Sequence, residues 1–366
     1  VYMYAGMADV AALTEDQAYI KALDALWTDL VFRKMYLTGG IGSSHHGESF
    51  GKAYDLPNAT AYNETCAAIA DIFWNQRMFL LHGDAKYHDV LERTLYNGFL
   101  SGISVSGNTF FYANPLACDG EWKFNVNVAA TRSPWFECSC CPPNIARLLA
   151  SLPGYVYAAQ GETLYVNLFV AGNAQIEIEG TKVNLQQETN YPWDGNIKIT
   201  VNPQQAKEFS LGLRIPGWVL DKPVPSDLYR YLQSNHDSPT ITVNGSAINL
   251  ERRQGYVFIN RKWQQGDTVE INLPMPIRRV LSHENVKDNV DRVAVERGPI
   301  VYCAEAVDNG GHALDLHLAD NAELSTHQED LLGGLTVIRG GGLTLIPYYA
   351  WSHRGEGEMA VWLQRD

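Results

Sequence analysis

Hydrophobic residues recur at helical spacing in the first part of the chain and alternate with polar residues in the rest. Over residues 14–35 apolar side chains fall three or four positions apart, which predicts a long amphipathic helix. Thr14 and Gln17 form a capping-box pattern at its start. The same period predicts further helices, the second of them capped by Asp84. Their ranges are 66–82, 87–100 and 144–152.

After Pro153-Gly154 the hydrophobic period becomes two, which is typical of strands with one buried face. The predicted strands are 164–170, 175–179, 196–201, 240–243, 256–259 and 268–273. Short strands with frequent turns favour antiparallel β-sandwich domains. Pro274-Met275-Pro276 marks a boundary, so three domains are predicted: a helical domain at 1–155, a β-sandwich at 156–276 and a second, sandwich-like domain at 277–366.

The predicted helices are too few to close a barrel of their own. They suffice for about half of an α/α toroid, and a half toroid leaves bare the faces meant for its missing neighbours. The chain also begins at Val1 in what reads as a helical region. We therefore expect either that an N-terminal part is missing or that another subunit, such as a second copy in a homodimer, completes the barrel.

Composition narrows the class of ligand. The chain has 366 residues, 46% of them hydrophobic, and a net charge of −13. An acidic chain without clustered Lys and Arg argues against nucleic acid and anionic membrane as partners. No apolar run is long enough to cross a bilayer, and the first residues lack a signal-peptide pattern. A neutral ligand fits better, and the 19 Tyr and 9 Trp would suit stacking on sugar rings.

Three of the six cysteines lie within the four residues Cys138-Ser139-Cys140-Cys141, directly before Pro142-Pro143. Adjacent cysteines make a strained disulfide, whereas their thiolates bind Zn²⁺ well. The prolines suit a first helical turn, whose positive end would lower the pKa of these thiols. Glu64 and Cys66 supply two more donors, and their i,i+2 spacing points both side chains one way only if the helix begins after Glu64. Clustered cysteines favour a reducing compartment, the cytoplasm.

A glycine-rich segment at 38–51, Thr-Gly-Gly-Ile-Gly-Ser-Ser-His-His-Gly-Glu-Ser-Phe-Gly, precedes this second pair of donors. It lacks the Gly-Lys-Ser/Thr ending of a phosphate-binding loop, so nucleotide binding is excluded. What remains is a loop that presents His45, His46 and Glu48. A carboxylic acid in a partly apolar site can act as a general acid and base near neutral pH.

Four ordered motifs resemble glycoside hydrolase family 127, the zinc-dependent β-L-arabinofuranosidases. They are TGGIGSSHHGESFG, YNETCAAIA, FFYANPL and FECSCCPPN, followed by β-sandwich sequence. The resemblance implies that an α/α toroid carries the active site. It also implies that the toroid begins upstream of Val1, with further substrate-binding residues there, so that the isolated chain is expected to be weakly active or inactive.

Carried over by position, the resemblance implies a zinc ion bound by Glu64, Cys66, Cys140 and Cys141. Cys140 would be the nucleophile, Glu48 the acid/base and Tyr112 a substrate contact; His45 and His46 could touch sugar hydroxyls. Together they would carry out a retaining double displacement on an arabinofuranosyl glycan.

Several alternatives remain open at this stage. The zinc site could be purely structural in a carbohydrate-binding or assembly protein, or the enzyme could be a related exo-glycosidase with another sugar. Glu137 rivals Glu48 as the acid/base. The remaining thiols, those of Cys138, Cys118 and Cys303, are expected to be inert and buried. Trp122 and Trp135 are candidates for stacking on sugar, with core packing the favoured role.

Overall fold

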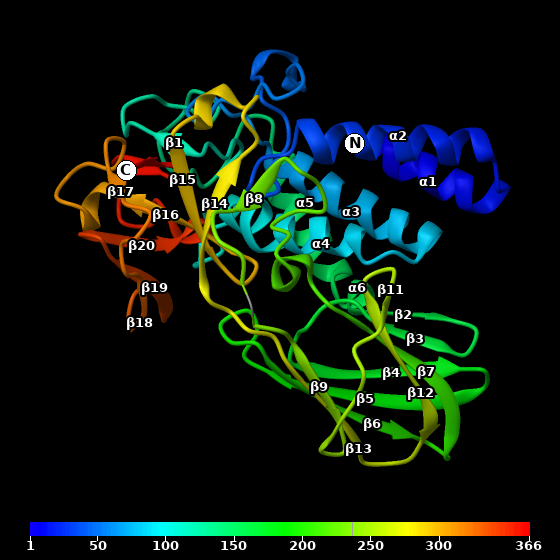
Figure 1. Ribbon diagram of the computed structural model, residues 1–366. Coiled ribbons are helices and arrows are strands. Elements are labelled where there is room, and N and C mark those ends of the chain that lie inside the picture. The colour runs from blue at the N-terminus through cyan, green and yellow to red at the C-terminus, as the bar shows by residue number, and fades with distance from the viewer. Residues whose placement is uncertain (236) are drawn as a thin grey trace.

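Helices fill the first part of the chain and strands the rest, as the change of hydrophobic period predicts. The computed structural model describes residues 1–235 and 237–366. Figure 1 shows the helices grouped at one side, with β-sheets below and beside them. The helices are α1 (Tyr2–Thr14), α2 (Gln17–Arg33), α3 (Thr65–His82), α4 (Lys86–Arg93), α5 (Cys141–Ser151) and α6 (Pro153–Val156). No helix of the described residues combines the length and apolar character needed to cross a membrane.

The predicted helices are confirmed, but the start of the first predicted one, 14–35, was placed wrongly: it corresponds to α2. Thr14 ends α1, and the cap of α2 is Asp16, whose carboxylate accepts a hydrogen bond from the Ala18 amide at 2.8 Å. The capping-box pattern therefore belongs to a tight junction between two helices. The N-cap of α4 is Ala85 and not Asp84, but the Asp84 carboxylate, one residue earlier, accepts a hydrogen bond from the Lys86 amide at 3.0 Å.

Helix α3 is the centre of the helical part. It packs against α1, α4 and α5, and thirteen of its eighteen residues are buried. Helix α4 continues into a π-helical turn, η2 (Thr94–Phe99), where a single regular helix was predicted over 87–100.

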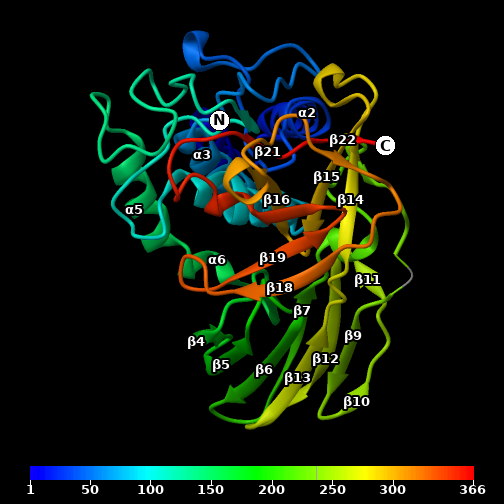
Figure 2. The same ribbon diagram turned by 90° about the vertical axis from the view of Figure 1, so that its left-hand side faces the viewer.

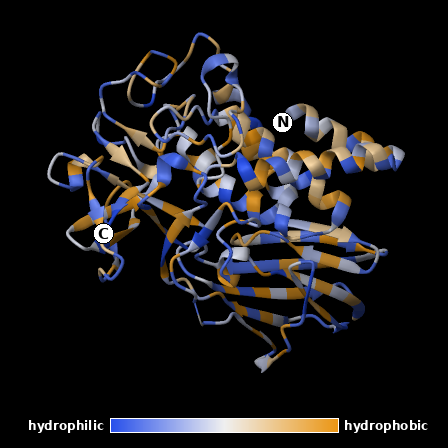
Figure 3. Cartoon of the chain, turned by 45° about the horizontal axis from the view of Figure 1, so that its top comes forward, coloured by the Kyte–Doolittle hydropathy of each residue, from blue (hydrophilic) through white to orange (hydrophobic). Residues whose placement is uncertain are grey.

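Two sheets share one hydrophobic core in the middle of the chain. The first has the order β10-β9-β13-β6-β5-β4 and the second β11-β12-β7-β3-β2. Their strands alternate between hydrophobic and hydrophilic residues in Figure 3. All neighbours are antiparallel except β3 and β7. The bounds are β2 (Tyr157–Gln160), β3 (Thr163–Val166), β4 (Gly172–Ile178), β5 (Thr181–Thr189), β6 (Asn196–Pro203), β7 (Lys207–Arg214), β9 (Thr240–Val243), β10 (Ser246–Ala247), β11 (Arg252–Arg253), β12 (Tyr256–Trp263) and β13 (Asp267–Asn272).

An eleven-stranded sheet forms from the last ninety residues and two recruited strands. Its main path is β17-β22-β15-β16-β20-β19-β18, with β14, β8, β21 and β1 attached. Figure 2 shows it above the other sheets. Its strands are β1 (Ala117–Cys118), β8 (Tyr229–Tyr231), β14 (Ile277–Ser282), β15 (Arg292–Arg297), β16 (Ile300–Glu305), β17 (His317–Leu318), β18 (Ser325–Glu329), β19 (Leu335–Gly340), β20 (Leu343–Pro347), β21 (Met359–Ala360) and β22 (Leu363–Arg365).

Buried ion pairs join the helical part to both β regions. Arg214 of β7 pairs with Asp89 of α4 at 2.8 Å and also with Glu92. On the other side, Arg93 pairs with Glu296 of β15 at 2.9 Å, and neither side chain is more than 3% exposed. Two consecutive residues of α4, Glu92 and Arg93, thus contact two different sheets through β7 and β15.

Candidate metal and catalytic centre

The N-terminus of α3 orients the first two candidate ligands. Glu64 is the N-cap, with φ −58° and ψ 137°, and Cys66 lies in the first turn. Because the backbone is still extended at Glu64, both side chains can point the same way, as the i,i+2 spacing required. The adjacent Thr65 anchors this end, since its amide donates to the Tyr112 carbonyl at 2.9 Å and its hydroxyl to the Phe111 carbonyl at 2.7 Å.

The N-terminus of α5 supplies the other two ligands. Cys140 is its N-cap and Cys141 its first residue, and Pro142 and Pro143 complete the first turn. Proline is favourable there because the first amides of a helix have no partner within the helix. The positive ends of α3 and α5 therefore both face the cluster, which favours negatively charged sulfur and oxygen.

The four side chains converge on one point. One donor atom each from Glu64, Cys66, Cys140 and Cys141 lies within 4.8 Å of the other three. The Sγ atoms of Cys140 and Cys141 are 3.7 Å apart, and Glu64 Oε1 is 3.5 Å from the Cys140 sulfur. In a tetrahedral site with Zn–S bonds of about 2.3 Å and a Zn–O bond of about 2.1 Å, the ligand atoms are separated by roughly 3.6–3.8 Å. The chemistry and the spacing of these donors fit a zinc ion.

The cluster places negative charge on one sulfur. The thiols of Cys141 and Cys66 donate hydrogen bonds to Cys140 and lower its pKa far below that of a free thiol. The pKa of Cys66 is raised to about 12 by its contact with Cys140. Burial, together with the Cys140 sulfur, raises the pKa of Glu64 to about 8. Of the three thiols in the group, that of Cys140 is the only one whose pKa is lowered, so it loses its proton most readily.

The loop that carries Glu48 is held at its tip and at its start. At its tip, the amides of Ser44 and Ser49 donate to each other's carbonyl oxygens at 3.1 and 3.2 Å. At its start, Gly39 has φ +75°, and a Cβ there would lie 2.5 Å from the Thr94 hydroxyl. Only glycine allows this loop to pack so closely against the π-helical turn.

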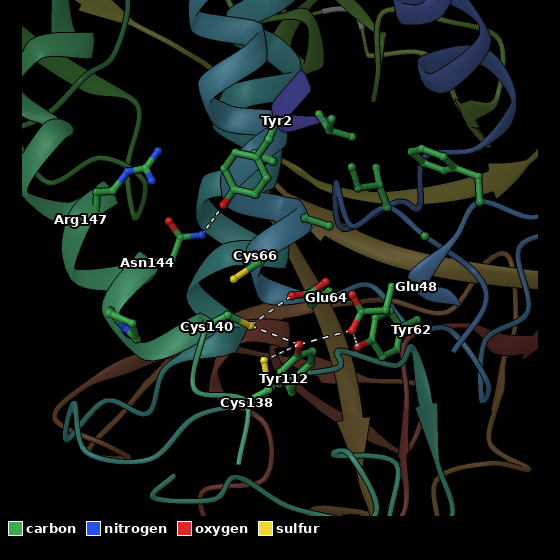
Figure 4. A pocket seen from close by; sticks show the side chains of 17 residues that line it. Tyr2, Glu48, Tyr62, Glu64, Cys66, Tyr112, Cys138, Cys140, Asn144 and Arg147 are labelled. Carbon is green, nitrogen blue, oxygen red and sulfur yellow. Dashed lines mark hydrogen bonds between the residues drawn. The ribbon is translucent and has the colours of Figure 1, made fainter. Parts of the chain in front are cut away.

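Tyr112 lies between the carboxylate and the thiolate. Its hydroxyl oxygen is 3.3 Å from Glu48 Oε1 and 3.2 Å from Cys140 Sγ. The hydroxyl of Tyr62 donates to the same Glu48 oxygen at 2.8 Å. Figure 4 shows this row of groups from Cys140 through Tyr112 to Glu48 and Tyr62.

These groups line a cavity of about 710 Å³. Its walls come from five parts of the chain: the Glu48 loop, the N-terminal ends of α1, α3 and α5 with the residues just before them, and the segment that carries Tyr112. The lining residues with polar, charged or thiol side chains are Tyr2, Glu48, Tyr62, Glu64, Cys66, Tyr112, Cys138, Cys140, Asn144 and Arg147. The volume is large enough for a sugar-sized ligand.

The two histidines lie beside the cavity, and neither is among its lining residues. The His45 ring packs edge-on against Tyr62, with ring centroids 4.7 Å apart, and against Trp122 at 5.3 Å. His46 contributes its backbone carbonyl, which accepts a hydrogen bond from the Ser49 hydroxyl at 3.0 Å. Their predicted contacts with substrate stay a prediction.

Some expectations about neighbouring side chains were wrong. Cys138 is exposed and lines the cavity, whereas Cys118 and Cys303 are buried as expected. Trp122 and Trp135 are 39% and 60% exposed, so neither is a core residue. Both stand in the irregular segment between β1 and α5, where no period indicates which side chains face inward. Glu137 is exposed and is not among the lining residues.

Two features of the site do not follow from the sequence pattern. Tyr62 stands two residues before Glu64, but Asn63 between them has φ +42°, so the alternation of extended backbone does not place the Tyr62 side chain. The positive charge of the α3 N-terminus is the second feature, because the i,i+2 spacing of Glu64 and Cys66 predicts only where this helix begins. Asn144 and Arg147, one helical turn apart on α5, also line the cavity.

Comparisons with known proteins agree along the whole chain. Three family models match in succession: the GH127 catalytic domain of beta-L-arabinofuranosidase at residues 2–154, the GH127 middle domain at 163–275 and the glycoside hydrolase family 127 C-terminal domain at 277–364. A curated protein of Bifidobacterium longum subsp. longum, named non-reducing end beta-L-arabinofuranosidase, is 37% identical over 404 aligned positions. That alignment covers 100% of this chain and 58% of the relative.

Solved structures give the same result. One described as a GH127 beta-arabinofuranosidase is 46% identical, with a TM-score of 0.94. A GH127 beta-L-arabinofuranosidase from Geobacillus stearothermophilus T6 is 44% identical, with a TM-score of 0.91. Each comparison covers 100% of this chain and 59% of the other, so the chain spans about three-fifths of the length of these relatives.

Proposed function

Because the chain belongs to glycoside hydrolase family 127, we propose that it acts as a β-L-arabinofuranosidase that retains the configuration of its sugar. The substrate would be a glycan or aryl glycoside with a terminal arabinofuranosyl unit. One observation carries the proposal: a single tyrosine hydroxyl contacts both the Cys140 sulfur and the Glu48 carboxylate within one cavity. Retaining glycosidases need a nucleophile and an acid/base close together; in the usual enzymes, where both are carboxyl groups, these lie about 5–5.5 Å apart.

The metal of the proposal is zinc, held by Glu64, Cys66, Cys140 and Cys141. A bound zinc ion would supply positive charge that keeps sulfur ionised near neutral pH. The protein itself contributes the position of that sulfur. Cys140 stands at a helix N-cap between Cys141 and Tyr112, so it points into the cavity without a long flexible side chain.

Two steps follow from these positions. In the first, the Cys140 sulfur forms a bond to the anomeric carbon while the bond to the leaving oxygen breaks, and Glu48 gives that oxygen its proton. In the second, the Glu48 carboxylate takes a proton from water, whose oxygen bonds to the anomeric carbon as the carbon–sulfur bond breaks. The sugar leaves with its original configuration, and both residues return to their starting states.

The architecture belongs to the same proposal. We take α1 to α5 as part of an α/α toroid, the two sheets that share a core as a β-sandwich, and the last sheet as a sandwich-like domain. The proposed bounds are 1–155, 156–276 and 277–366. Every proposed catalytic group precedes Pro153, so the proposed chemistry lies entirely in the first of these domains.

The test is zinc-dependent release of arabinose from an aryl β-L-arabinofuranoside. Cys140→Ser should lower hydrolysis at least about 1,000-fold, because a serine hydroxyl is not ionised at neutral pH. Cys138→Ser is the matched control: it changes another thiol that lines the cavity but lies outside the ligand group, and it should keep most of the activity.

Covalent labelling gives a second readout that does not need turnover. An L-arabinofuranosyl bromoacetamide should alkylate Cys140 faster than any other thiol, with free arabinose slowing the reaction. Undiminished hydrolysis by Cys140→Ser, or equal labelling of Cys138 and Cys140, would overturn the proposed role of Cys140.

A further inference from the structure

The carboxylate of Glu48 stands on an unusual piece of backbone. Gly47 and Glu48 are both in the left-handed region, with φ +67° and +49°. A non-glycine residue there is held against its own preference, and such residues gather at functional sites. The backbone of Glu48 is therefore well defined, while its exposed side chain still has three rotatable bonds to restrain.

Both hydrogen bonds to this carboxylate reach the same oxygen. Tyr62 donates to Oε1 at 2.8 Å, and the Tyr112 hydroxyl lies 3.3 Å from it. Among the described residues no hydrogen bond reaches Oε2. The two oxygens of Glu48, a residue that lines the cavity, thus differ: one is held by two phenols, and the other has no hydrogen bond among the described residues.

The two tyrosines are not equivalent. The Tyr112 hydroxyl has one hydrogen and three neighbours, Glu48, the Cys140 sulfur at 3.2 Å and the Cys138 sulfur at 4.0 Å, so it cannot donate to all of them at once. The closer contact to Glu48 comes from Tyr62, which does not touch the sulfur in any described hydrogen bond. Tyr62 is the better anchor for the carboxylate.

Tyr62 is itself rigidly placed. Only 5% of it is exposed, its backbone carbonyl accepts a hydrogen bond from the Asn114 amide at 3.0 Å, and its ring packs edge-on against His45. The next residue, Asn63, donates its amide to the Gly42 carbonyl at 2.8 Å, which ties this segment to the loop of Glu48. A buried ring between two anchored segments can hold a mobile side chain in one orientation.

We propose that Tyr62 is a positioning residue for Glu48: its hydroxyl holds Oε1, so that Oε2 is the oxygen that exchanges the proton with the substrate. The inference rests on the proposed function, since it assigns an orientation to the acid/base. In the first step Oε2 carries the proton and gives it to the leaving oxygen, which keeps the electron pair of the broken bond. In the second step Oε2 accepts a proton from water.

The need for this proton depends on the leaving group. That dependence distinguishes a Tyr62 that positions Glu48 from a Tyr62 that only stabilises the fold. A dinitrophenolate leaves without protonation, whereas an alkoxide does not. Tyr62→Phe should lower kcat/KM for a methyl or disaccharide β-L-arabinofuranoside about 10- to 100-fold and for a dinitrophenyl arabinofuranoside less than about 3-fold. The loss should appear in kcat with KM little changed.

Tyr54→Phe is the matched control. Tyr54 lies in the same connection between α2 and α3, stacks on His283 at 4.8 Å between ring centroids and is not among the lining residues. It should leave both substrates unaffected. An equal loss of both substrates in Tyr62→Phe, or no loss of either, would overturn the inference.

A crystal structure of Tyr62→Phe decides the matter without turnover. The inference expects the Glu48 carboxylate to rotate or to occupy several orientations, and an unchanged single orientation would overturn it. The proposed function fails separately: if Glu48→Gln leaves hydrolysis of the methyl glycoside intact, Glu48 is not the acid/base, whatever Tyr62 does to its position.

Discussion

At the scale of single residues, the centre combines four candidate metal ligands with two helix N-termini. Glu64 caps α3 and Cys140 caps α5, so neither of these two ligands depends on a flexible loop for its position. The sulfur–sulfur distance of 3.7 Å between Cys140 and Cys141 is already that of a tetrahedral zinc site. A site prepared in this way would need little rearrangement to take the proposed zinc ion.

Loss of one ligand should therefore be measurable as loss of metal. In Cys66→Ala and in Glu64→Ala we expect zinc to fall from about one ion per chain to less than about a tenth after dialysis against a weak chelator, because three donors remain of four. Elemental analysis of the purified variants measures this. Cys303→Ala, which changes a buried thiol of β16 outside the group, should keep the full zinc content. Zinc retained at full occupancy in both ligand variants would contradict the assigned site.

At the scale of elements, α4 and its π-helical continuation hold the molecule together. Beside the ion pairs of Asp89, Glu92 and Arg93, the Asn97 side chain donates to the Pro299 carbonyl at 2.9 Å and accepts from the Val301 amide at 2.8 Å. The π-helical turn widens the helix at this position and coincides with the contact to Gly39 and to β16. The same short segment thus supports the Glu48 loop and binds a strand of the last sheet.

Breaking one buried ion pair tests this role. Arg93→Met leaves the Glu296 carboxylate without its charged partner in a fully buried place and should lower the free energy of unfolding by about 3–5 kcal/mol. Arg33→Met removes a guanidinium that is 53% exposed in its pair with Asp29, and should change it by less than about 1 kcal/mol. Urea unfolding at pH 7 measures both.

The double variant completes this test. Adding Glu296→Gln to Arg93→Met removes the unpaired charge and should restore part of the lost stability. An effect of Arg93→Met no larger than that of Arg33→Met would mean that α4 is not held to β15 through this pair.

At the scale of the whole molecule, the order of helical and strand regions could be predicted because each depends on local periodicity. Pairing between distant segments could not. Strand β8 has three residues and joins β14, and β1 has two and joins β21, more than two hundred positions later. Such short strands leave no readable period, and their partners are set by packing around the helices.

The same limit applies to the site. The spacing of cysteines beside prolines predicts Cys140 and Cys141, and i,i+2 spacing predicts Glu64 with Cys66, since both depend on neighbours in sequence. The exposure of Cys138 and the contact of Tyr62 with Glu48 depend on how irregular segments fold against each other. No local pattern contains that information.

One long-range contact, made by His353, should make the stability of the folded chain depend on pH. His353, in the last part of the chain, donates from Nδ1 to the Ala350 carbonyl at 2.8 Å and accepts at Nε2 from the Val105 amide of the helical part at 2.9 Å. This pattern requires the neutral ring. Burial and the nearby Arg132 guanidinium lower the pKa of His353 to about 4.

The sign of the effect follows from that shift. Above about pH 6.5 the ring is neutral in both the folded and the unfolded chain, and its contribution to stability is complete. As the pH falls towards 4 the unfolded chain takes up a proton that the folded chain refuses, so stability is lost. His353→Gln cannot titrate, and the wild-type chain should lose about 1–2 kcal/mol more than this variant between pH 7 and pH 4.5, measured by urea unfolding. If the two proteins show parallel pH profiles, the His353 ring accepts a proton as readily in the folded chain as in the unfolded chain. The bond between Val105 and His353 would then not couple the helical part to the last sheet.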